Sequence, residues 1–386
     1  MERSLVCRSL IVKVASRCNL NCSYCYVYNQ GDTTYQSQPK IMRDDTAAAI
    51  IARVRSHCTK HRIHHFEFIF HGGEPLLVDK MFLRDFLTIA KTVLTGITLS
   101  FSLQTNGVLL DPVWCQWLKG LGIHVGISLD GPEAVNDKVR VDHRGAGSYH
   151  RVVQGIRNAQ HAGLSFGVLS VIDIRSDPQE VYEHLKALAI ARINFLLPYA
   201  SHDHPPPGIT TDTDDTPYAD WLLTVFDQWF DEDPPKPSVR LFEQTIQLVL
   251  GMGGGYEALG SRNLELLVIE TDGSIEAAGS LKTCGNGFTK AGMNVHAHEL
   301  DEALQTNLAR QYHLSHQQLP QPCSSCSLRS ICGGGHMVHR YQKDKGFDNP
   351  SVLCRDMIKF ITHVQRRLHT MLSNAVIQMP VIEPVT

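Results

Sequence analysis

The chain has 386 residues and a formal net charge of −3 at pH 7, which gives no electrostatic reason to expect nucleic acid or an anionic membrane as a partner. It contains no run of about 18 consecutive apolar residues, and its first nine residues lack the apolar stretch of a signal peptide. We therefore expect a cytoplasmic protein with one large and one smaller domain. In this setting its eleven cysteines are expected to be ligands rather than disulfides.

The first predicted strand, residues 5–15, ends where a C-x3-C-x2-C run begins. Its cysteines are Cys18, Cys22 and Cys25. Three thiolates can ligate three irons of a [4Fe-4S] cluster, which is usually held by four. The remaining iron then keeps an open position that can chelate a small molecule through amino and carboxylate groups. A zinc site, which needs a fourth nearby ligand, and a disulfide with a spare thiol are the alternatives.

Strand and helix patterns then alternate along the chain. Further strands are predicted at residues 65–70, 98–103, 124–129, 166–172 and 193–197. Helices are predicted at residues 42–57, 82–94, 111–121, 149–162 and 178–189. Six strands alternating with helices predict an α/β fold, a partial (β/α)6 barrel of the TIM type with parallel strands. Active residues of such a barrel lie at the carboxyl ends of its strands.

Several segments that can carry chemistry fall at these strand ends. They are the cysteine run and residues 72–74, 104–106, 128–130 and 197–198. Residues 200–217, rich in proline and aspartate, leave the sixth strand on the same face. This segment is either a plain surface loop or a lip that contacts the substrate.

Three prolines in residues 231–238 predict a domain boundary. We expect a barrel in residues 1–235, and a helical linker followed by a second, metal-binding domain in residues 236–386. A β-hairpin is predicted within residues 264–277. A second cysteine group follows, with C-x2-C-x5-C spacing and a fourth member 22 residues on: Cys323, Cys326, Cys332 and Cys354. Spacing alone allows either zinc or iron-sulfur in this closed site.

Both cysteine groups, together with Gly72-Gly73-Glu74-Pro75 and Ser128-Leu129-Asp130-Gly131, resemble radical SAM enzymes that carry a SPASM domain. The resemblance covers nearly the whole chain. Shorter segments resemble the FxsB group of peptide-modifying radical SAM enzymes, at residues 25–28, 194–198, 218–221, 270–274, 280–283 and 346–351.

The resemblance implies S-adenosylmethionine and two [4Fe-4S] clusters as cofactors. The catalytic cluster would be held by Cys18, Cys22 and Cys25, and the auxiliary cluster by Cys323, Cys326, Cys332 and Cys354. Implied contacts to S-adenosylmethionine come from Tyr24, Gly72, Gly73, Glu74, Ser128, Arg140 and Leu197. In these roles Tyr24 and Leu197 lie near the adenine, residues 72–74 meet the methionyl amino group, and Ser128 and Arg140 hold the ribose and carboxylate.

Four of these residues also have simpler interpretations. Arg140 alone would read as a surface ion-pair partner, and Ser128 as a hydrogen-bonded strand residue. A glycine pair at a strand end is commonly just a turn. Their convergence on one face of the barrel favours the ligand-binding interpretation.

The chain departs from a full SPASM domain, which holds two auxiliary clusters. His336 stands where a cysteine is expected four residues after Cys332, and the hairpin offers only Ala277 and Ala278. We therefore expect two clusters in total. A degenerate extra site formed by Cys284 and His336 is the alternative.

The implied function is modification of a ribosomally made precursor peptide. A 5′-deoxyadenosyl radical would abstract a side-chain β-hydrogen, and the carbon radical would form an intra-peptide C–C cross-link to an aromatic residue, a cyclophane. The alternatives are a formylglycine-generating sulfatase maturase and a non-catalytic iron-sulfur scaffold or peptide-binding protein.

The proton acceptor and the partners are less well defined. No residue is assigned as the base; Glu270, Asp272 and Asp203 are candidates by location only. An electron donor such as flavodoxin or ferredoxin is implied. Because the first strand begins near residue 5, we expect no leader-binding domain ahead of the barrel. Recognition of the peptide then falls to the barrel mouth, the second domain or a separate protein.

Overall fold

The computed structural model describes residues 5–210 and 214–377. The strands of its main sheet are β1 (Ser9–Ala15), β2 (His65–Gly72), β3 (Thr98–Thr105), β4 (His124–Ser128), β5 (Phe166–Val171), β6 (Arg192–Leu196), β7 (Ser238–Val239), β10 (Leu266–Ile269) and β11 (Ile275–Glu276). Their order is β11-β10-β1-β2-β3-β4-β5-β6-β7. All neighbours pair in parallel except β10 and β11. A separate two-stranded ribbon consists of β8 (Gly255–Tyr256) and β9 (Leu259–Gly260).

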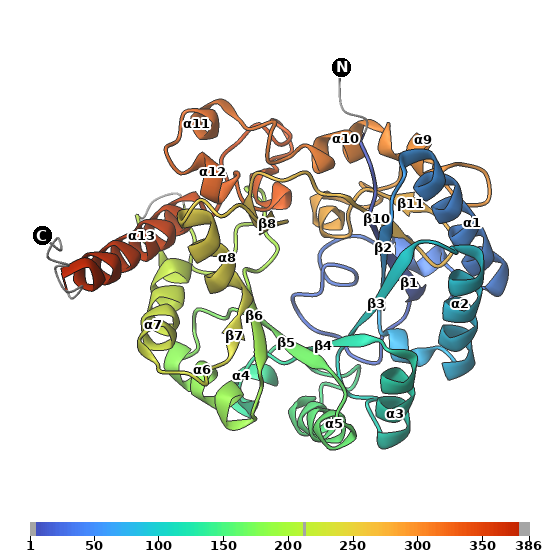
Figure 1. The fold of residues 1–386 in the computed structure, drawn as a ribbon, viewed down its shortest axis with the longest axis horizontal. Helices are drawn as coiled ribbons and strands as arrows, with labels where there is room; N and C mark the ends of the chain where they lie inside the picture. The colour runs from blue at the N-terminus through green and yellow to red at the C-terminus, as the bar shows by residue number, and fades with distance from the viewer. Residues whose placement is uncertain (1–4, 211–213, 378–386) are drawn as a thin grey trace, which may run out of the picture.

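The strands form an open arc with helices on its outer side (Figure 1). The α-helices are α1 (Asp44–His61), α2 (Lys80–Val93), α3 (Pro112–Leu121), α4 (Glu133–Asn136), α5 (Tyr149–Ala162), α6 (Pro178–Ala187), α7 (Pro217–Asp231), α8 (Arg240–Val249), α9 (Leu300–Leu304), α10 (Asn307–His313), α11 (Gln321–Ser324), α12 (Arg329–Cys332) and α13 (Cys354–Ile377). Short 3-10 helices are η1 (Thr34–Ser37), η2 (Pro75–Leu77), η3 (Ser280–Cys284) and η4 (Met337–Arg340). Among the described residues, no helix is both long and apolar enough to cross a membrane.

The predicted partial barrel of alternating strands and helices is confirmed. Local sequence signals explain where its helices begin and end. The Asp111 carboxylate accepts the Trp114 N–H at the start of α3, and Pro112 takes the first helical position. Gly122 and Gly163 end α3 and α5 in the left-handed conformation, which glycine adopts without strain.

Strand β2 shows how the two faces of the sheet differ. Its burial alternates, with three phenylalanines fully buried toward the helices: Phe66, Phe68 and Phe70. Phe86 of α2 packs edge-on against two of them. The alternate residues point into the arc, where His71 pairs in register with Lys13 of β1. The outer face therefore supplies the apolar core, whereas the inner face carries polar groups.

The sheet extends across the predicted boundary between residues 235 and 236. On one side β7 pairs with β6, and on the other β10 pairs with β1. The predicted hairpin is present as β10 and β11. Phe360 of α13 packs against Phe226 of α7 and Phe242 of α8. The second part of the chain thus completes both edges of the sheet, and the division into two domains stays a prediction.

A buried ion-pair network ties the hairpin to the barrel. Lys13 Nζ lies 2.7 Å from Glu270 Oε1. Lys282 Nζ lies 3.3 Å from the same oxygen, 3.4 Å from Asp32 and 3.1 Å from Glu276. All five side chains are at most 3 % exposed. Burial alone would raise the pKa of Glu270, but the two lysines lower it to about 2. The network keeps opposite charges paired where water is excluded.

We expect replacement of Lys282 by methionine to destabilise the fold. The substitution leaves buried carboxylates with one cation fewer, and breaking a buried pair in this way costs about 3–5 kcal/mol of the free energy of unfolding. Guanidinium denaturation of the cluster-loaded protein measures the change. The exposed Lys345→Met is the matched control and should change stability by less than about 0.5 kcal/mol. Equal midpoints for the two variants would contradict the expectation.

Candidate functional site

The loop that follows β1 lies inside the arc of strands (Figure 1). Backbone hydrogen bonds hold it there, from Asn21 N to Val141 O at 2.7 Å and from Ser23 N to Val139 O at 2.9 Å. The loop therefore pairs with the segment beyond β4, on the carboxyl-terminal side of the strands. This contact fixes the position of the predicted catalytic cysteines.

The structure brings Cys18, Cys22 and Cys25 close enough to influence one another electrostatically. Burial raises the pKa of the Cys18 thiol to about 12, and repulsion from Glu74 and from the other two thiols adds to the shift. The pKa values of Cys22 and Cys25 are also raised, mainly by burial. Such thiols ionise readily only beside a bound metal, which replaces the solvation lost on burial.

The four cysteines of the second group also come together, from α11, the turn that follows it, α12 and the start of α13. Burial raises the pKa of Cys332 to about 11, with further repulsion from Cys354, Cys323 and Cys326. Both groups therefore supply the thiol-only donor sets that iron-sulfur clusters require.

The spacing of the sulfurs separates a cluster from a zinc ion. A tetrahedral zinc with Zn–S bonds near 2.3 Å holds its sulfurs about 3.8 Å apart. Among the described residues, neither cysteine group brings three sulfurs within 4.8 Å of one another. An iron-sulfur cluster spreads its ligands more widely, because each thiolate binds a different iron. The residues present fit a cluster better than a single zinc.

Gly72 and Gly73 lie where the end of β2 meets the cysteine loop. A Cβ on Gly72 would come within 2.1 Å of Ala15 O, and one on Gly73 within 2.2 Å of Arg17 O. Gly72 also has a φ of +149°, which disfavours a side chain. The glycine pair is thus required for the close backbone approach that forms this face, and its contact with the methionyl amino group stays a prediction.

Glu74 is fully buried and organises the end of β3. Its carboxylate accepts hydrogen bonds from Leu76 N, Thr105 Oγ1 and Asn106 N, at 2.7–3.0 Å. The Asn106 amide in turn lies 3.6 Å from Cys18 Sγ. Protein donors already occupy both carboxylate oxygens. Glu74 is therefore placed to position Asn106, and the implied contact with S-adenosylmethionine falls most naturally to the backbone of this segment.

The half-buried Tyr24 and the buried Asp130 and Arg140 form a polar chain beside the triad. Tyr24 Oη donates to Asp130 Oδ2 at 2.6 Å and accepts from Arg140 Nη1 at 2.6 Å. Arg140 is 5 % exposed, and its Nε has no partner. The surface ion-pair interpretation of Arg140 is thus excluded by its burial. Its unpaired donor is available to an anionic ligand group such as a carboxylate.

Ser128 and Leu197 lie at the ends of β4 and β6, on the same face. Ser128 Oγ accepts a hydrogen bond from Gln104 Nε2 at 2.9 Å. Gly126 leaves room for this glutamine, because a Cβ there would lie 2.0 Å from Gln104 Oε1. Leu197 is half-buried and packs on the apolar core. That Ser128 contacts the ribose and Leu197 the adenine stays a prediction.

A cavity of about 570 Å³ opens beside the cysteine loop. Tyr24 and Asp130 line its inner wall, while Arg175, Tyr199 and Tyr218 line its sides. The segment after β6 contributes His204 and three prolines, residues 205–207. This part of the predicted lip therefore faces the cavity; its residues 211–213 lie outside the described part of the chain.

The carboxylates suggested as bases are engaged elsewhere. Glu270 is held ionised between lysines, so its proton affinity is low. Asp272 accepts the Ser274 N–H at 2.9 Å within a turn. Asp203 accepts the Lys343 N–H at 2.8 Å. None of the three is assigned as the proton acceptor by its geometry.

His336, at the position expected for an additional cluster ligand, makes a polar contact with Glu257. His336 Nδ1 lies 3.6 Å from Glu257 Oε1, and its ring packs against Tyr199 and His339. Burial alone would raise the pKa of Glu257, but His336 and neighbouring donors lower it to about 2. Burial raises the pKa of the Cys284 thiol, and the negative charge of Asp203, rather than His336, adds to this shift. This arrangement favours two clusters over a degenerate third site.

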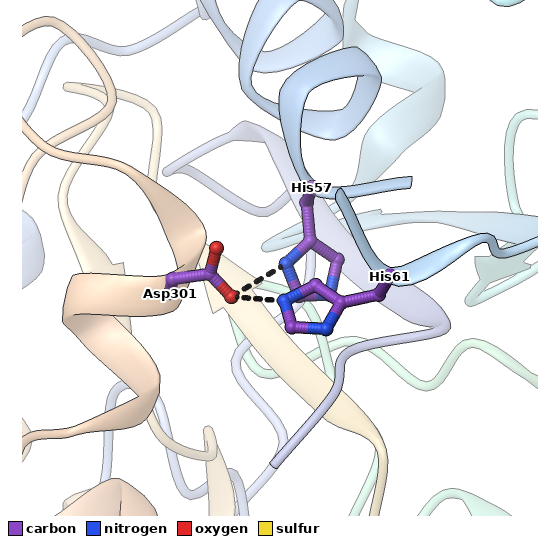
Figure 2. Close-up of side chains that lie close together, drawn as sticks. All are labelled: His57, His61 and Asp301. Carbon is purple, nitrogen blue, oxygen red and sulfur yellow. Dashed lines mark hydrogen bonds and ion pairs between the residues drawn. The ribbon is translucent and has the colours of Figure 1, made fainter. Parts of the chain in front are cut away.

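A separate group, His57, His61 and Asp301, has the geometry of a metal site but not its chemistry (Figure 2). His57 Nε2 accepts the Cys7 N–H at 3.0 Å. Burial lowers the pKa of His57, so the ring is neutral and its proton sits on Nδ1, 3.1 Å from Asp301 Oδ1. A protonated nitrogen cannot bind metal. The group, joined by Lys60 at 2.9 Å, instead links α1 to α9.

Sequence reasoning assigned no role to Asn106, Asp130, Gln104 or Lys13. The first three follow or end apolar strands, which was a usable signal for this face. Lys13 interrupts an apolar strand, and an unpaired lysine there would be strongly unfavourable. Its partners come from more than 250 residues away, so the sequence could signal a buried pair without naming it.

Comparison with known proteins connects this geometry to a family. Residues 12–188 match the family described as "Radical SAM superfamily". The chain is 25 % identical over 375 residues to a serine-type anaerobic sulfatase-maturating enzyme of Bacteroides thetaiotaomicron, covering 92 % of this chain and 88 % of the relative. It is 24 % identical over 364 residues to a cysteine-type enzyme of Clostridium novyi, covering 91 % of this chain and 94 % of the relative.

A solved structure shares the complete fold. The structure of native anSMEcpe with bound AdoMet and Kp18Cys peptide superimposes with a TM-score of 0.80 and 22 % sequence identity, covering 95 % of this chain and 99 % of the other. The fold of the C-terminal part is thus shared as well, and the two thiol groups of this chain supply the donor sets that [4Fe-4S] clusters require. The similarity to radical SAM proteins thus covers residues 12–188 by the family match, and the sulfatase-maturating relatives extend it over more than nine tenths of the chain.

Proposed function

We propose that this enzyme oxidises a peptide side chain by removing two hydrogens. The observation that carries the proposal is the cavity of about 570 Å³ between the cysteine loop and the lip. Its aromatic and proline-rich walls suit an extended peptide, because such side chains offer apolar contact with little loss of conformational entropy. The relatives with curated names act on sulfatases, and the similar solved structure contains a peptide.

The two hydrogens leave in different forms. When bound, S-adenosylmethionine and the catalytic cluster supply a 5′-deoxyadenosyl radical, which takes one hydrogen atom from a β-carbon. The other hydrogen leaves as an electron and a proton. The chain contributes placement and exclusion of water, through Tyr24, through the buried Asp130 and Arg140, and through the lip. An electron donor such as flavodoxin or ferredoxin would supply the reducing electron.

The specific product proposed is a cyclophane, a C–C cross-link from the β-carbon to an aromatic residue of the same precursor peptide. Local resemblance to the FxsB group supports this product, as does the replacement of a cluster cysteine by His336. The second candidate is formylglycine in a sulfatase, which the two sulfatase-maturating relatives favour. Both products of a serine-containing peptide lack two hydrogens, so the structure of the product decides between them.

We expect anaerobically reconstituted protein to contain about eight irons, from two [4Fe-4S] clusters. Replacing Cys18, Cys22 and Cys25 together by alanine should leave about four irons and abolish 5′-deoxyadenosine formation. Replacing Cys323 and Cys326 should also leave about four irons but retain cofactor cleavage. Iron assay and chromatography of the nucleoside measure both. A content near about twelve irons would contradict the two-cluster arrangement.

Product analysis tests the proposed function. The reduced enzyme should convert a peptide encoded by a short reading frame beside its gene, with aromatic residues near the C-terminus, to a product lacking two hydrogens. Tandem mass spectrometry should show no backbone fragments between the linked residues, because the cross-link holds both pieces together. A control peptide with a sulfatase serine should stay unmodified. An aldehyde that reacts with hydroxylamine on that control would establish formylglycine formation instead.

Replacing His202, Asp203 and His204 by alanine tests the lip. His204 lines the cavity, whereas His202 and Asp203 fasten the segment to Pro350 O and Lys343 N. We expect uncoupled 5′-deoxyadenosine production to be nearly unchanged and KM for the peptide to rise, because the lip acts on binding. Exposed His64→Ala is the control. Wild-type kinetics in the triple variant would reduce the segment to a plain surface loop.

A further inference from the structure

Arg340 is a buried cation beside the second cysteine group. It ends η4, is 2 % exposed, and is the bulkiest of the fully buried side chains among the described residues. Its Nε has no hydrogen-bond partner. Its backbone is fixed by the Asn349 amide, which donates to Arg340 O at 3.0 Å. A buried guanidinium is strongly unfavourable without a compensating negative charge.

The thiols are the anionic groups that act on this guanidinium. Burial lowers the pKa of Arg340 to about 10, and only Cys323 and Cys332 oppose that shift. The contact is close, because a Cβ on Gly334 would lie 3.4 Å from Arg340 Nη1. Gly334 belongs to the turn after Cys332, and its N–H donates to the Cys332 sulfur. The guanidinium therefore lies against the turn that carries a cluster ligand.

Another titratable group near Arg340 is His316, and it adds no charge. Its Nδ1 lies 2.7 Å from Gly333 O, and its Nε2 has no partner. Burial lowers its pKa, so the imidazole is neutral at pH 7. Arg355 also acts on Cys354, but its side chain is 60 % exposed and pairs with Asp214 at 2.6 Å. The buried positive charge at this group of cysteines therefore comes from Arg340.

The catalytic cysteines have a different electrostatic setting. Their nearby cation, Arg140, is hydrogen-bonded to Tyr24 and faces the Asp130 carboxyl group. Glu74 acts on Cys18 from the other side. Positive charge is thus offset by carboxyl groups at the triad, whereas thiols and no carboxyl group act on Arg340 at the second group.

We propose that Arg340 is a positioning residue of the auxiliary cluster that sets its reduction potential above that of the catalytic cluster. One-electron reduction adds negative charge to the cluster, and a buried cation stabilises the reduced state more than the oxidised one. The auxiliary cluster on Cys323, Cys326, Cys332 and Cys354 can then accept the electron released as the new C–C bond forms, while the proton goes to water. Transfer of that electron to the auxiliary cluster rests on the proposed function. The effect of Arg340 on the reduction potential of the auxiliary cluster does not.

Redox titration monitored by electron paramagnetic resonance tests the proposal. It is run on the cluster-loaded full chain and on the triple alanine variant of Cys18, Cys22 and Cys25, whose signal comes from the auxiliary cluster alone. Arg340→Gln keeps a polar group without charge, and Arg340→Lys keeps the charge. Arg329→Gln is the matched control, because Arg329 is exposed and only three residues before Cys332.

Arg340→Gln should lower the equilibrium constant for reduction of the auxiliary cluster at least tenfold, a shift of about 59 mV to more negative potential. Arg340→Lys and Arg329→Gln should stay near the wild type, since water screens the exposed arginine. The catalytic cluster should be unchanged in all three.

A wild-type auxiliary potential in Arg340→Gln with full iron content would overturn the proposal. Loss of the auxiliary cluster in both Arg340 variants would overturn it too, since Arg340 would then be an assembly residue. If no peptide is modified, the proposed function fails, but the titration still decides the role of Arg340.

Discussion

Two backbone hydrogen bonds, which join the residues after β2 to the end of β1 and the start of the cysteine loop, hold this face of the sheet together. Gly73 N donates to Ala15 O at 2.8 Å, and Glu74 N donates to Arg17 O at 2.9 Å. A side chain at Gly73 would collide with this backbone, so only glycine permits the approach. The buried Glu74 carboxylate then carries the contact on to Asn106 at the end of β3. The ends of three parallel strands are thereby fixed relative to the first cysteine.

The two faces of the sheet differ in the kind of side chain that they bury, and this difference gives them different roles. The outer face packs phenylalanines and aliphatic side chains against the helices, and this apolar contact supplies the core. The inner face holds charged groups, and each is paired because an isolated charge there would be strongly unfavourable. Lys13 and Lys282 with Glu270 connect the first strand to the C-terminal hairpin. The same network explains why the sheet extends across the predicted domain boundary.

The two cysteine groups differ in their surroundings more than in their ligands. Both consist of buried or half-buried thiols, and among the described residues neither group brings three sulfurs within 4.8 Å of one another, as one zinc ion would need. The triad offers three thiols and lies beside a cavity and the Arg140 donor, which suits the predicted binding of a small charged molecule. The second group offers four thiols and lies beside the buried Arg340, on which no carboxyl group acts. The surroundings of the triad therefore suit binding of a ligand, whereas those of the second group suit stabilisation of added negative charge.

The sequence by itself determined the cysteine spacing, the alternation of strands and helices, and the strand ends where the site forms. These are local signals, since periodicity and caps act within about ten residues. Tertiary structure alone decided that β10 pairs with β1, that Glu74 supports Asn106, and that Arg340 lies under Cys332. Such contacts join residues that local patterns do not relate. Their partners are selected by burial, which requires every enclosed charge and polar group to find a complement, and burial exists only once the chain has folded.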